Sequence, residues 1–480
     1  MSSVLANERD NIRKLYPETF KQAKKSRTKG QIIFFLILIY LIVGFFTLDV
    51  VDIPKKWKPQ NAAMFVLDTY AHKDHVTMKW ESPDDIKIAF EGNYRSVYGR
   101  DNLDKSIPDW FYKNSDNIGK VIEFNNLGKA ILYKDRVEIV NFPKYERDFT
   151  IKLNANGKPY VVGSENLAKS ELKGFRITEN RVEFRPTLHE RIQVYPKKVE
   201  IHRYSLGWKY FWFDFSSPLE PYSFFEALAL TFSNERVVPE MSNLKLFLTE
   251  IKDNEAFMHG RVWWAMLETI VMAVLGTMFA TVMALPLSFL AAYNVTPIKA
   301  LRFTLRRLFD TLRGIDFLIW SLIFLRAFGP GPFTGIFAIG FTDTGTLGKL
   351  YSEAIENTEK KQQEGVQSTG ASKFLQHRFG IIPQILPIFV SQSLYYLESN
   401  TRGAVIIGAM GAGGIGLQFL GALATGNDFE NVAYMAILVL AVVIFMDRLS
   451  AWLRRILIGS CLLYTSPSPR DRQKSRMAGW

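Results

Sequence analysis

Cysteine and histidine are scarce in this chain. The one cysteine in 480 residues is Cys461, so no disulfide can form within the chain. His72 and His75 are three residues apart, but no cysteine or further histidine lies near them in the sequence. We therefore expect surface histidines at these positions and no metal site.

Nucleotide-binding patterns are also missing. No segment matches G-x-x-x-x-G-K-[ST], and the near match at Gly421 and Gly426 has Asn427 in the place of the lysine. Gly411–Gly416 has the spacing G-x-G-x-x-G, but a long apolar segment precedes it and no βαβ pattern surrounds it. We expect close helix packing or a helix break there, and any ATP hydrolysis would need another chain.

Basic residues outnumber acidic residues by 59 to 47, which gives a formal net charge of +12. A nucleic-acid-binding or lipid-binding patch is one interpretation. However, the basic residues gather beside apolar runs, between Arg9 and Lys29 and again between Lys299 and Arg313. Lysine and arginine beside membrane spans mark the cytoplasmic side. We therefore expect contact with membrane lipid and no nucleic-acid partner.

The chain is too long for one ordinary domain, and its two halves differ in composition. Residues 52 to 260 are polar and aromatic, whereas residues 263–457 are mostly apolar. Residues 32–51 form a further apolar run, long enough to cross a bilayer as a helix. No small-residue cleavage site is evident, so we expect an uncleaved anchor whose basic flank, residues 1–31, stays in the cytoplasm.

Residues 52–225 are predicted to form an extracytoplasmic domain rich in β-strands. Alternating stretches recur at residues 120–124, 130–133, 136–140, 149–153, 181–184 and 199–204. The Asn, Gly and Pro between them indicate short antiparallel strands. The aromatic stretch 208–215 alternates too, and we expect a core strand there, with packing near the membrane surface as the alternative.

Residues 263–458 are predicted to form a membrane domain, with residues 226–262 as a connector. Apolar runs predict spans at 263–292 (interrupted by Pro286), 315–328, 332–351, 384–410 and 431–453, and the N-terminal anchor makes six. This topology places the polar stretch 352–383 and both termini in the cytoplasm. The predicted fold class is an all-α polytopic membrane domain with an inserted β-rich extracytoplasmic domain.

The last residues, 461–480, share no pattern with the rest of the chain. Cys461–Asp471 reads CLLYTSPSPRD, which looks like a translated sequencing-adaptor read-through. A genuine disordered cytoplasmic tail is the alternative. We expect no contribution of these residues to the fold.

The polar stretch between the two long apolar blocks has a skeleton of Glu364, Gly370 and Ile382-Pro383. The segment Glu364–Ala371 predicts a helix, a turn and a second helix, because glycine permits a sharp backbone turn. An ordinary cytoplasmic loop is the alternative interpretation.

Motifs spread from Met241 to Ile458 resemble the permeases of phosphonate-type ABC transporters, which are type I importers. They include Glu364–Ala371, Arg306–Asp310, Gly329–Phe333, Glu398–Arg402 and Gly411–Gly416. The general family pattern is Glu-Ala-Ala, three residues, Gly, nine residues, Ile-x-Leu-Pro. This chain has Gly365 and Val366 for the two alanines, Gly380 for the isoleucine and Ile382 for the leucine, which suits the phosphonate-type subfamily. The large insertion at 52–225 is a departure, because typical members have only a short connection there.

This resemblance implies a permease homodimer in the bacterial inner membrane, two ABC ATPase subunits and a periplasmic phosphonate-binding protein. ATP would be bound by the ATPase, so this chain would hold no cofactor. The ATPase-coupling loop would contain Glu364, Gly365, Ser368, Thr369, Gly370, Ala371 and Pro383. The translocation path would contain Glu398, Asn400, Arg402, Gly411, Gly413, Gly414 and Gly416.

Glu398 and Arg402 lie four residues apart in an apolar segment, so a helix would bring them to one side. Charges at membrane depth are costly and usually face a bundle interior or a water-filled cavity. One interpretation is a self-neutralising pair that orients the helix. The other is that Arg402 attracts an anionic substrate that Glu398 helps to position.

The predicted function is therefore the permease subunit of an ATP-driven importer of phosphonate or a related phosphorus oxyanion. A membrane-anchored envelope scaffold or sensor that uses the β-rich domain is the alternative. A stand-alone secondary transporter would need paired repeats and coupling residues that are not clear in the sequence. No nucleophile–base pair or metal cluster stands out, so we do not expect an enzyme. Which oxyanion is carried stays open, because the binding protein normally sets selectivity.

Overall fold

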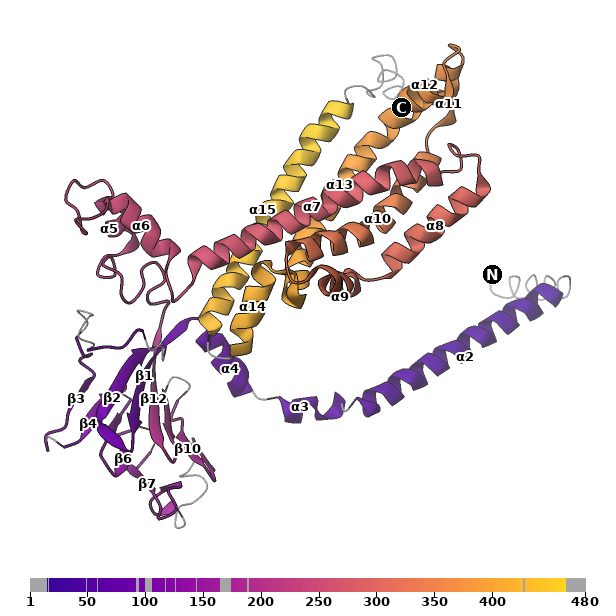
Figure 1. The fold of residues 1–480 in the computed structure, drawn as a ribbon. Helices are drawn as coiled ribbons and strands as arrows, with labels where there is room; N and C mark the ends of the chain where they lie inside the picture. Colours follow the sequence, from indigo (N-terminus) through magenta and orange to yellow (C-terminus); the bar gives the residue numbers. More distant parts are fainter. Residues whose placement is uncertain are drawn as a thin grey trace, which may run out of the picture. The chain divides into compact units, whose positions relative to one another are not determined.

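The structure is a computed structural model (Figure 1). It describes residues 15, 17–48, 50–57, 59–91, 95–99, 106–116, 118–125, 127–143, 145–164, 174–187, 190–425 and 428–462. The basic residues Arg9, Arg13 and Lys14, the pair Gly426-Asn427 and the tail from residue 463 lie outside these ranges. The chain divides into two compact units, residues 1–64 and 65–480.

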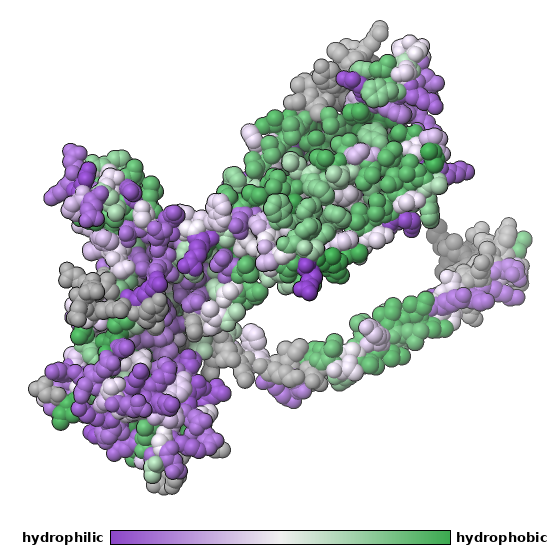
Figure 2. Space-filling view, in the orientation of Figure 1, coloured by the Kyte–Doolittle hydropathy of each residue, from purple (hydrophilic) through white to green (hydrophobic). Residues whose placement is uncertain are grey.

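The first unit is dominated by one long helix. Helix α2 spans Pro17–Thr47, and it is followed by η1 (Val50–Asp52), α3 (Ile53–Lys56) and the start of α4 (Pro59–Asp68). Apolar side chains from Ile32 onward are exposed along α2, which Figure 2 shows as a hydrophobic stretch. The part from Lys25 to Thr47 is long and apolar enough to cross a membrane, as the sequence predicts for this region.

The second unit begins with a β-sandwich of two six-stranded antiparallel sheets. One has the order β2-β1-β12-β11-β10-β9 and the other β3-β4-β5-β6-β7-β8. The strands of the first sheet are β1 (Ala71–Lys79), β2 (Ser82–Phe90), β9 (Phe175–Thr178), β10 (Arg181–Phe184), β11 (Glu190–Val194) and β12 (Lys198–Leu206). Those of the second are β3 (Phe111–Lys113), β4 (Lys120–Glu123), β5 (Lys129–Leu132), β6 (Arg136–Val140), β7 (Phe149–Leu153) and β8 (Pro159–Val161). All six stretches predicted from alternation are strands.

One hydrophobic core joins the two sheets. Val76, Ile201 and Phe184 from the first sheet pack with Ile122 and Ile151 from the second, all fully or almost fully buried. Each of these residues occupies an inward position of its strand, which is why alternation in the sequence marks them. Because β1 pairs with β12, the sandwich begins and ends at adjacent points, Ala71 and Leu206.

The prediction of a core strand at 208–215 is wrong. These residues form turns, and Tyr210 has a positive φ of 60°. The Asn254 side-chain amide donates to the carbonyls of Tyr210 and Phe211 at 2.9 and 3.2 Å. These carbonyls are therefore not available to pair with a neighbouring strand. The aromatic rings instead pack onto the ends of helices: Phe211 lies 5.2 Å from Tyr434 between ring centroids.

Two short helices connect the sandwich to the helical domain. Helix α5 spans Phe224–Leu230 and begins with a capping box between Ser223 and Glu226, and α6 spans Asn243–Lys252. The Asn243 amide joins the two helices by donating to the carbonyls of Leu230 and Glu235. The segment predicted as a connector therefore has helical structure of its own.

The described residues from His259 to Leu462 are mostly helical. Their elements are α7 (His259–Ala291), α8 (Lys299–Gly314), α9 (Phe317–Phe328), α10 (Pro332–Glu356), α11 (Lys360–Gln367), α12 (Lys373–Gln376), η3 (His377–Ile381), α13 (Ile382–Ile407), η4 (Gly408–Ala412), α14 (Gly414–Thr425) and α15 (Phe429–Leu462). Helices α7 and α10 pack closely, since a Cβ on Gly340 would lie 2.3 Å from the Phe279 ring. The prediction that Pro286 interrupts this span is wrong, because α7 continues through it as one helix.

Among the described residues, four helices are long and apolar enough to cross a membrane: Lys25–Thr47, His259–Ala291, Lys373–Ala412 and Phe429–Ile458. The other two predicted spans are also helical, as α9 and α10. However, α9 has 12 residues and is too short to cross a bilayer alone. The total of six spans stays a prediction. Helices α8 and α14 are additions that the sequence did not predict.

Candidate functional site

The polar stretch after α10 has the predicted helix–turn–helix geometry. Glu364 and Gly365 lie on α11, and Ser368, Thr369, Gly370 and Ala371 form the turn before α12. Gly370 has a φ of +78°, in the left-handed region that favours glycine. The two hydroxyls close the end of α11, because Ser368 donates to the carbonyl of Gly365 and Thr369 to that of Val366, at 2.8 and 2.7 Å.

The predicted coupling loop was residues 352–383, but α10 continues to Glu356. Residues 357–383, named the coupling segment after that prediction, are fixed to the start of α13 by Gln384. Its side-chain oxygen accepts from the backbone N–H of Glu359 at 3.0 Å, and its nitrogen donates to the carbonyl of Gly380 at 2.6 Å. Gly380 lets η3 lie close to α11, since a Cβ on this residue would lie 3.1 Å from the Cα of Gln363. Pro383 lies in the first turn of α13, where its missing N–H costs nothing.

The coupling segment presents apolar side chains to solvent. Phe374 is 71% exposed and Phe379 is 60% exposed, and Leu375 between them is also exposed. The positions of Gly365 and Gly370 face open space. A compact apolar group on an otherwise polar surface is typical of a protein–protein contact.

Buried hydroxyls tie together the helices on either side of the coupling segment. Tyr351 of α10 is fully buried, and its ring stacks on Phe389 of α13 at 4.0 Å. Its hydroxyl lies 2.6 Å from the Ser393 hydroxyl, which also binds Thr281 of α7 at 3.2 Å. These contacts join α7, α10 and α13 next to the coupling segment.

The glycine block reverses the chain between α13 and α14. Gly411, Gly413 and Gly414 have φ values of +108°, +87° and +68°, so each adopts a backbone conformation that other residues rarely take. Gly416 permits contact between the two helices, because a Cβ there would lie 1.9 Å from the carbonyl oxygen of Val405. This agrees with the predicted role in helix packing.

Two side chains of α7 hold the beginning of α14, and the sequence did not reveal them. The Glu268 carboxylate accepts from the N–H of Gly414 at 3.1 Å, and the Thr269 hydroxyl accepts from that of Ile415 at 2.9 Å. These bonds satisfy backbone donors that a helix start leaves open. The available signal was a lone acid within the apolar run 263–292, but its partner lies 146 residues later.

Glu398 and Arg402 belong to a larger ionic network between α13 and α15. Glu398 lies 3.5 Å from both Arg402 and Arg454, and Arg402 lies 3.6 Å from Asp447. Two acids and two bases cancel in charge. The network therefore gives Arg402 anionic partners on both helices, which supports the interpretation as a self-neutralising group.

Asn400 lies on another face of α13, in a polar cluster at the centre of the helix bundle. Its amide nitrogen lies 2.5 Å from a carboxylate oxygen of Asp343 on α10 and 2.9 Å from the hydroxyl of Thr277 on α7. Asp343 and Thr277 are buried. Buried polar groups within a membrane domain are rare and mark functional positions.

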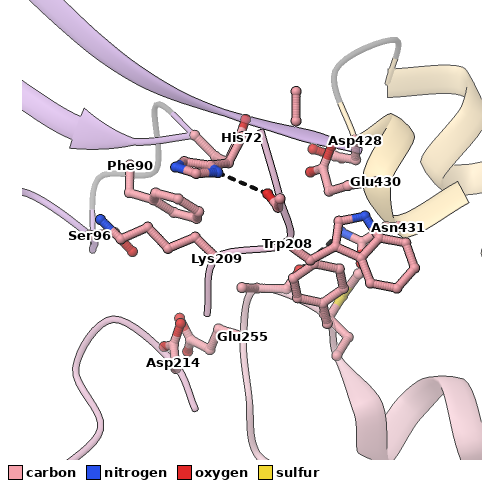
Figure 3. Close-up of a pocket in the computed structure, with 16 residues that line it drawn as sticks. His72, Phe90, Ser96, Trp208, Lys209, Asp214, Glu255, Asp428, Glu430 and Asn431 are labelled. Atoms are coloured by element: carbon pink, nitrogen blue, oxygen red, sulfur yellow. Dashed lines mark hydrogen bonds between the residues drawn. The ribbon is translucent and has the colours of Figure 1, made fainter. Parts of the chain in front are cut away.

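A cavity of about 340 Å³ lies where the sandwich meets the first turns of α7 and α15 (Figure 3). Burial raises the pKa of Glu91 on its wall, and the carboxylate of Glu430 raises it further. Burial also lowers the pKa of His72, whose Nδ1 lies 2.9 Å from the carbonyl of Gly207. None of the site residues predicted from the sequence lines this cavity.

Comparison with known proteins gives the family. Residues 284–457 match the binding-protein-dependent transport system inner membrane component family. The chain is 33% identical over 215 residues to the putative phosphite transport system permease protein HtxC of Stutzerimonas stutzeri, covering 45% of this chain and 74% of the relative. It is 41% identical over 112 residues to the putative cryptic phosphonate transport system permease protein PhnE2 of Escherichia coli, covering 23% of this chain and 91% of the relative.

A third relative is matched over less of its length. The chain is 34% identical over 199 residues to the phosphate-import permease protein PhnE of Mycolicibacterium smegmatis, which covers 42% of this chain and 37% of that relative. The match to the family profile lies within the helical domain, and the β-sandwich lies outside it. On these matches, the chain belongs to the family of binding-protein-dependent transport system inner membrane components, as a permease of the phosphonate type.

Proposed function

We propose that this chain is the permease subunit of an ATP-driven importer that moves phosphonate or a related phosphorus oxyanion across the bacterial inner membrane. The coupling segment is the observation that carries this proposal. It is a helix–turn–helix between α10 and α13, and it exposes Phe374 and Phe379. A groove of an ABC ATPase subunit would bind these side chains.

The contacts around this segment suit an importer, in which the motion of the ATPase has to reach the membrane helices. Closure of an ATPase dimer must displace membrane helices, so the contact has to be stiff. Gln384 fixes α11 to α13, and the Tyr351–Ser393 contact joins α13 to α10. The coupling residues Glu364, Gly365, Ser368, Thr369, Gly370, Ala371 and Pro383 would thus transmit the motion of the ATPase to the bundle.

The substrate class follows from the relatives, whose names describe permeases for phosphate, phosphite and phosphonate. These are anions, and transfer of a bare charge into the membrane interior costs about 10 kcal/mol or more. Polar groups within the bundle would lower that barrier, and Asn400 with Asp343 and Thr277 provides such a group. Gly411, Gly413, Gly414 and Gly416 would let α13 and α14 move at the gate.

The ionic network gives Glu398 and Arg402 a positioning role beside this path. Arg402 is half-exposed although it is paired with Glu398 and Asp447. In a permease homodimer its outward face would lie near the second copy or the path. Replacement by Arg402→Gln separates the roles: a substrate contact would raise the KM for uptake, whereas a positioning residue would lower thermal stability and leave the KM unchanged.

The orientation is inferred from the basic residues. Lys25, Arg27 and Lys29 precede the predicted anchor, Arg306 and Arg307 lie on α8, and Arg454 and Arg455 lie near the C-terminal end of α15. With these on the cytoplasmic side, both termini and the coupling segment are cytoplasmic, and the β-sandwich is periplasmic. A periplasmic binding protein would deliver the substrate from that side.

Reconstitution tests the proposal. The chain would be co-expressed with the ABC ATPase and binding protein encoded by neighbouring reading frames and placed in proteoliposomes. We expect ATP-dependent uptake of radiolabelled methylphosphonate, phosphite or phosphate, with sulfate as the control anion. Uptake that is independent of ATP, or a chain that assembles with no ATPase subunit, would contradict the proposal.

A further inference from the structure

Helix α6 has an exposed apolar face. Its residues Leu246, Phe247 and Ile251 are buried in a small core shared with α5. On the other side of the helix, Leu244 and Leu248 are 55% and 58% exposed, and a spacing of four places them side by side. Figure 2 shows hydrophobic surface on α5 and α6. A surface of this kind is typical of a contact with another molecule or with lipid.

An open groove of about 310 Å³ runs along this face of α6. Its described lining consists of two leucines, two lysines and two residues with a hydroxyl group: Leu244, Leu248, Lys245, Lys252, Ser242 and Thr249. Glu250, the acid within α6, is two residues from both Leu248 and Lys252, so it points to another side of the helix. Glu240 and Asp253 lie beyond the two ends of α6. The groove therefore combines an apolar floor with positive charge.

The end of α6 is fixed to the beginning of α7. Gly260, in the first turn of α7, permits this contact, because a Cβ there would lie 2.6 Å from the carbonyl oxygen of Lys252. The buried Asn254 fixes the link between the two helices, since its side-chain oxygen accepts from the N–H of Phe257 at 2.8 Å. The position of α6 relative to α7 is therefore set by the chain itself.

The beginning of α7 marks the level of the membrane surface. Helix α7 is long and apolar enough to cross a membrane, and it exposes Trp263 and Trp264 near its start. Tryptophan concentrates where lipid headgroups meet the hydrocarbon layer. Trp264 follows Gly260 by four residues, which is about 6 Å along the helix, and one headgroup layer is about 5 to 8 Å thick. The C-terminal end of α6 therefore lies at the level of the headgroups.

We propose that the exposed face of α6 lies on the membrane surface and that its groove binds a phospholipid. The phosphate group lies between Lys245 and Lys252, whose ammonium groups donate to its oxygens. An acyl chain lies against Leu244 and Leu248, together with the apolar stems of the lysines. The proposal rests on the membrane location of the family and not on the transported anion or the direction of transport.

A protein partner fits this face less well than lipid does. Lysine is depleted in the contact surfaces between proteins, whereas Lys245 and Lys252 flank the apolar floor here. Amphipathic helices with lysine beside an apolar face are typical of the lipid–water interface. A second copy of the chain and a binding protein are the other occupants that the experiment has to distinguish.

Fluorescence quenching by lipid tests the contact on the full chain in phosphatidylcholine nanodiscs. In a Cys461→Ser background, Leu248→Cys would carry an environment-sensitive fluorophore, and the lipid would carry a nitroxide on the acyl chain near the headgroup. We expect quenching at position 248 within about twofold of that at Leu267→Cys, on the exposed side of α7. Tyr160→Cys, on β8 of the sandwich, should show no quenching.

The two lysines are tested in the same assay. Lys245→Gln combined with Lys252→Gln should reduce quenching at position 248 about twofold or more. Lys79→Gln combined with Lys113→Gln removes the same charge from exposed positions of the sandwich and should leave the quenching unchanged. Quenching at position 267 shows that each variant is folded into the bilayer.

Three results would overturn the proposal. One is a fluorophore at position 248 that is exposed to water and not quenched. Another is blue-shifted emission without quenching, which would show that a protein, such as a second copy of the chain, covers α6. The third is quenching that the double lysine variant leaves unchanged, since the phosphate contact would then be absent.

Discussion

At the scale of single residues, glycines without a side chain allow α13 and α14 to approach each other closely. At Gly416, the first turn of α14 lies against the end of α13, and the nearest atoms around a hypothetical Cβ are backbone atoms that cannot move aside. The N–H groups of Gly414 and Ile415, which have no partner within the start of α14, donate to the side chains of Glu268 and Thr269. The glycines and the two caps together make a helix reversal possible where few polar partners are available.

Replacement of Gly416 by alanine should destabilise the helical domain strongly. The new Cβ would lie 1.9 Å from the Val405 carbonyl oxygen and 2.6 Å from the Ala409 nitrogen, so we expect a loss of about 3 kcal/mol. Thermal unfolding of the purified chain measures this. Gly421→Ala is the matched control, because nothing lies within 4 Å of that position. Since Gly421 lies inside α14, this variant should be as stable as the unaltered chain or more stable by up to about 1 kcal/mol.

Glu183 makes the β-sandwich sensitive to acid. Burial raises its pKa, but the hydrogen bond from Arg185 and the charges of Arg191 and Arg181 outweigh this and hold the pKa below its usual 4.5. A carboxyl with a lowered folded-state pKa stabilises the fold above the unfolded-state value. That stability is lost as the pH falls from about 4.5 through the folded-state pKa.

The variant Glu183→Gln should therefore lose about 2 kcal/mol at pH 7 and show a weaker decline of stability in acid. This estimate is below that for a fully buried pair, because the three arginines are each about a quarter exposed. Melting curves between pH 7 and pH 3 measure the effect. Glu179→Gln, which removes an exposed ion pair with Lys158, should behave like the unaltered chain.

At the scale of elements, the coupling segment combines a rigid base with an exposed tip. We predict that Phe374→Ala weakens binding of the ATPase subunit about tenfold, since large apolar side chains dominate interface energies. The stability of the chain itself should not change, because Phe374 is 71% exposed. Co-purification and calorimetry measure the two quantities.

The control for this variant is Phe303→Ala. Phe303 is 67% exposed on α8, outside the coupling segment, so its loss should leave ATPase binding intact. Equal weakening by both variants would show that the coupling segment has no special role.

Elements with strong local patterns were predictable. Alternation in β4 to β7 and uninterrupted apolar runs in α2 and α15 depend on near neighbours in the sequence, so the sequence shows them. Helix α8 was missed because its arginines were interpreted only as a mark of the cytoplasmic side, although Leu301, Leu305 and Phe309 recur every four residues on the side where α8 packs. Helix α14 was missed because it begins in a glycine block, which resembles a break.

Pairings between distant side chains were not predictable. The Glu398–Arg402 pair follows from a spacing of four on one helix, and it was found. Its partners Asp447 and Arg454 lie on α15, and Asp343 reaches Asn400 from α10. Such contacts depend on how helices pack, which no local pattern in one sequence reveals.

At the scale of the whole molecule, the β-sandwich is a structural domain distinct from the helical domain. Its ends meet, since Ala71 pairs with Leu206 and the N–H of Gly207 donates to the carbonyl of Tyr70 at 2.9 Å. Replacement of residues 71–206 by a short glycine-serine linker should therefore leave the helical domain folded. We expect ATPase binding within about twofold of the full chain.

This excision also separates the permease from the alternative of an envelope scaffold or sensor. Co-purification with the ATPase is the measurement, and the melting profile of the helical domain is its control. A folded helical domain that no longer binds the ATPase would favour the sandwich as the active part.

The most direct measurement determines on which side of the membrane the turn at Ser368 lies and which subunit it contacts. In a Cys461→Ser background, a cysteine introduced by Ser368→Cys would be tested in intact cells with a membrane-impermeant maleimide and with a thiol cross-linker. We predict no labelling from outside and a cross-link to the ATPase subunit, while a cysteine at the exposed position of β8, Tyr160→Cys, is labelled from outside. Labelling of Ser368→Cys from outside, or a cross-link to no nucleotide-hydrolysing subunit, would contradict the account.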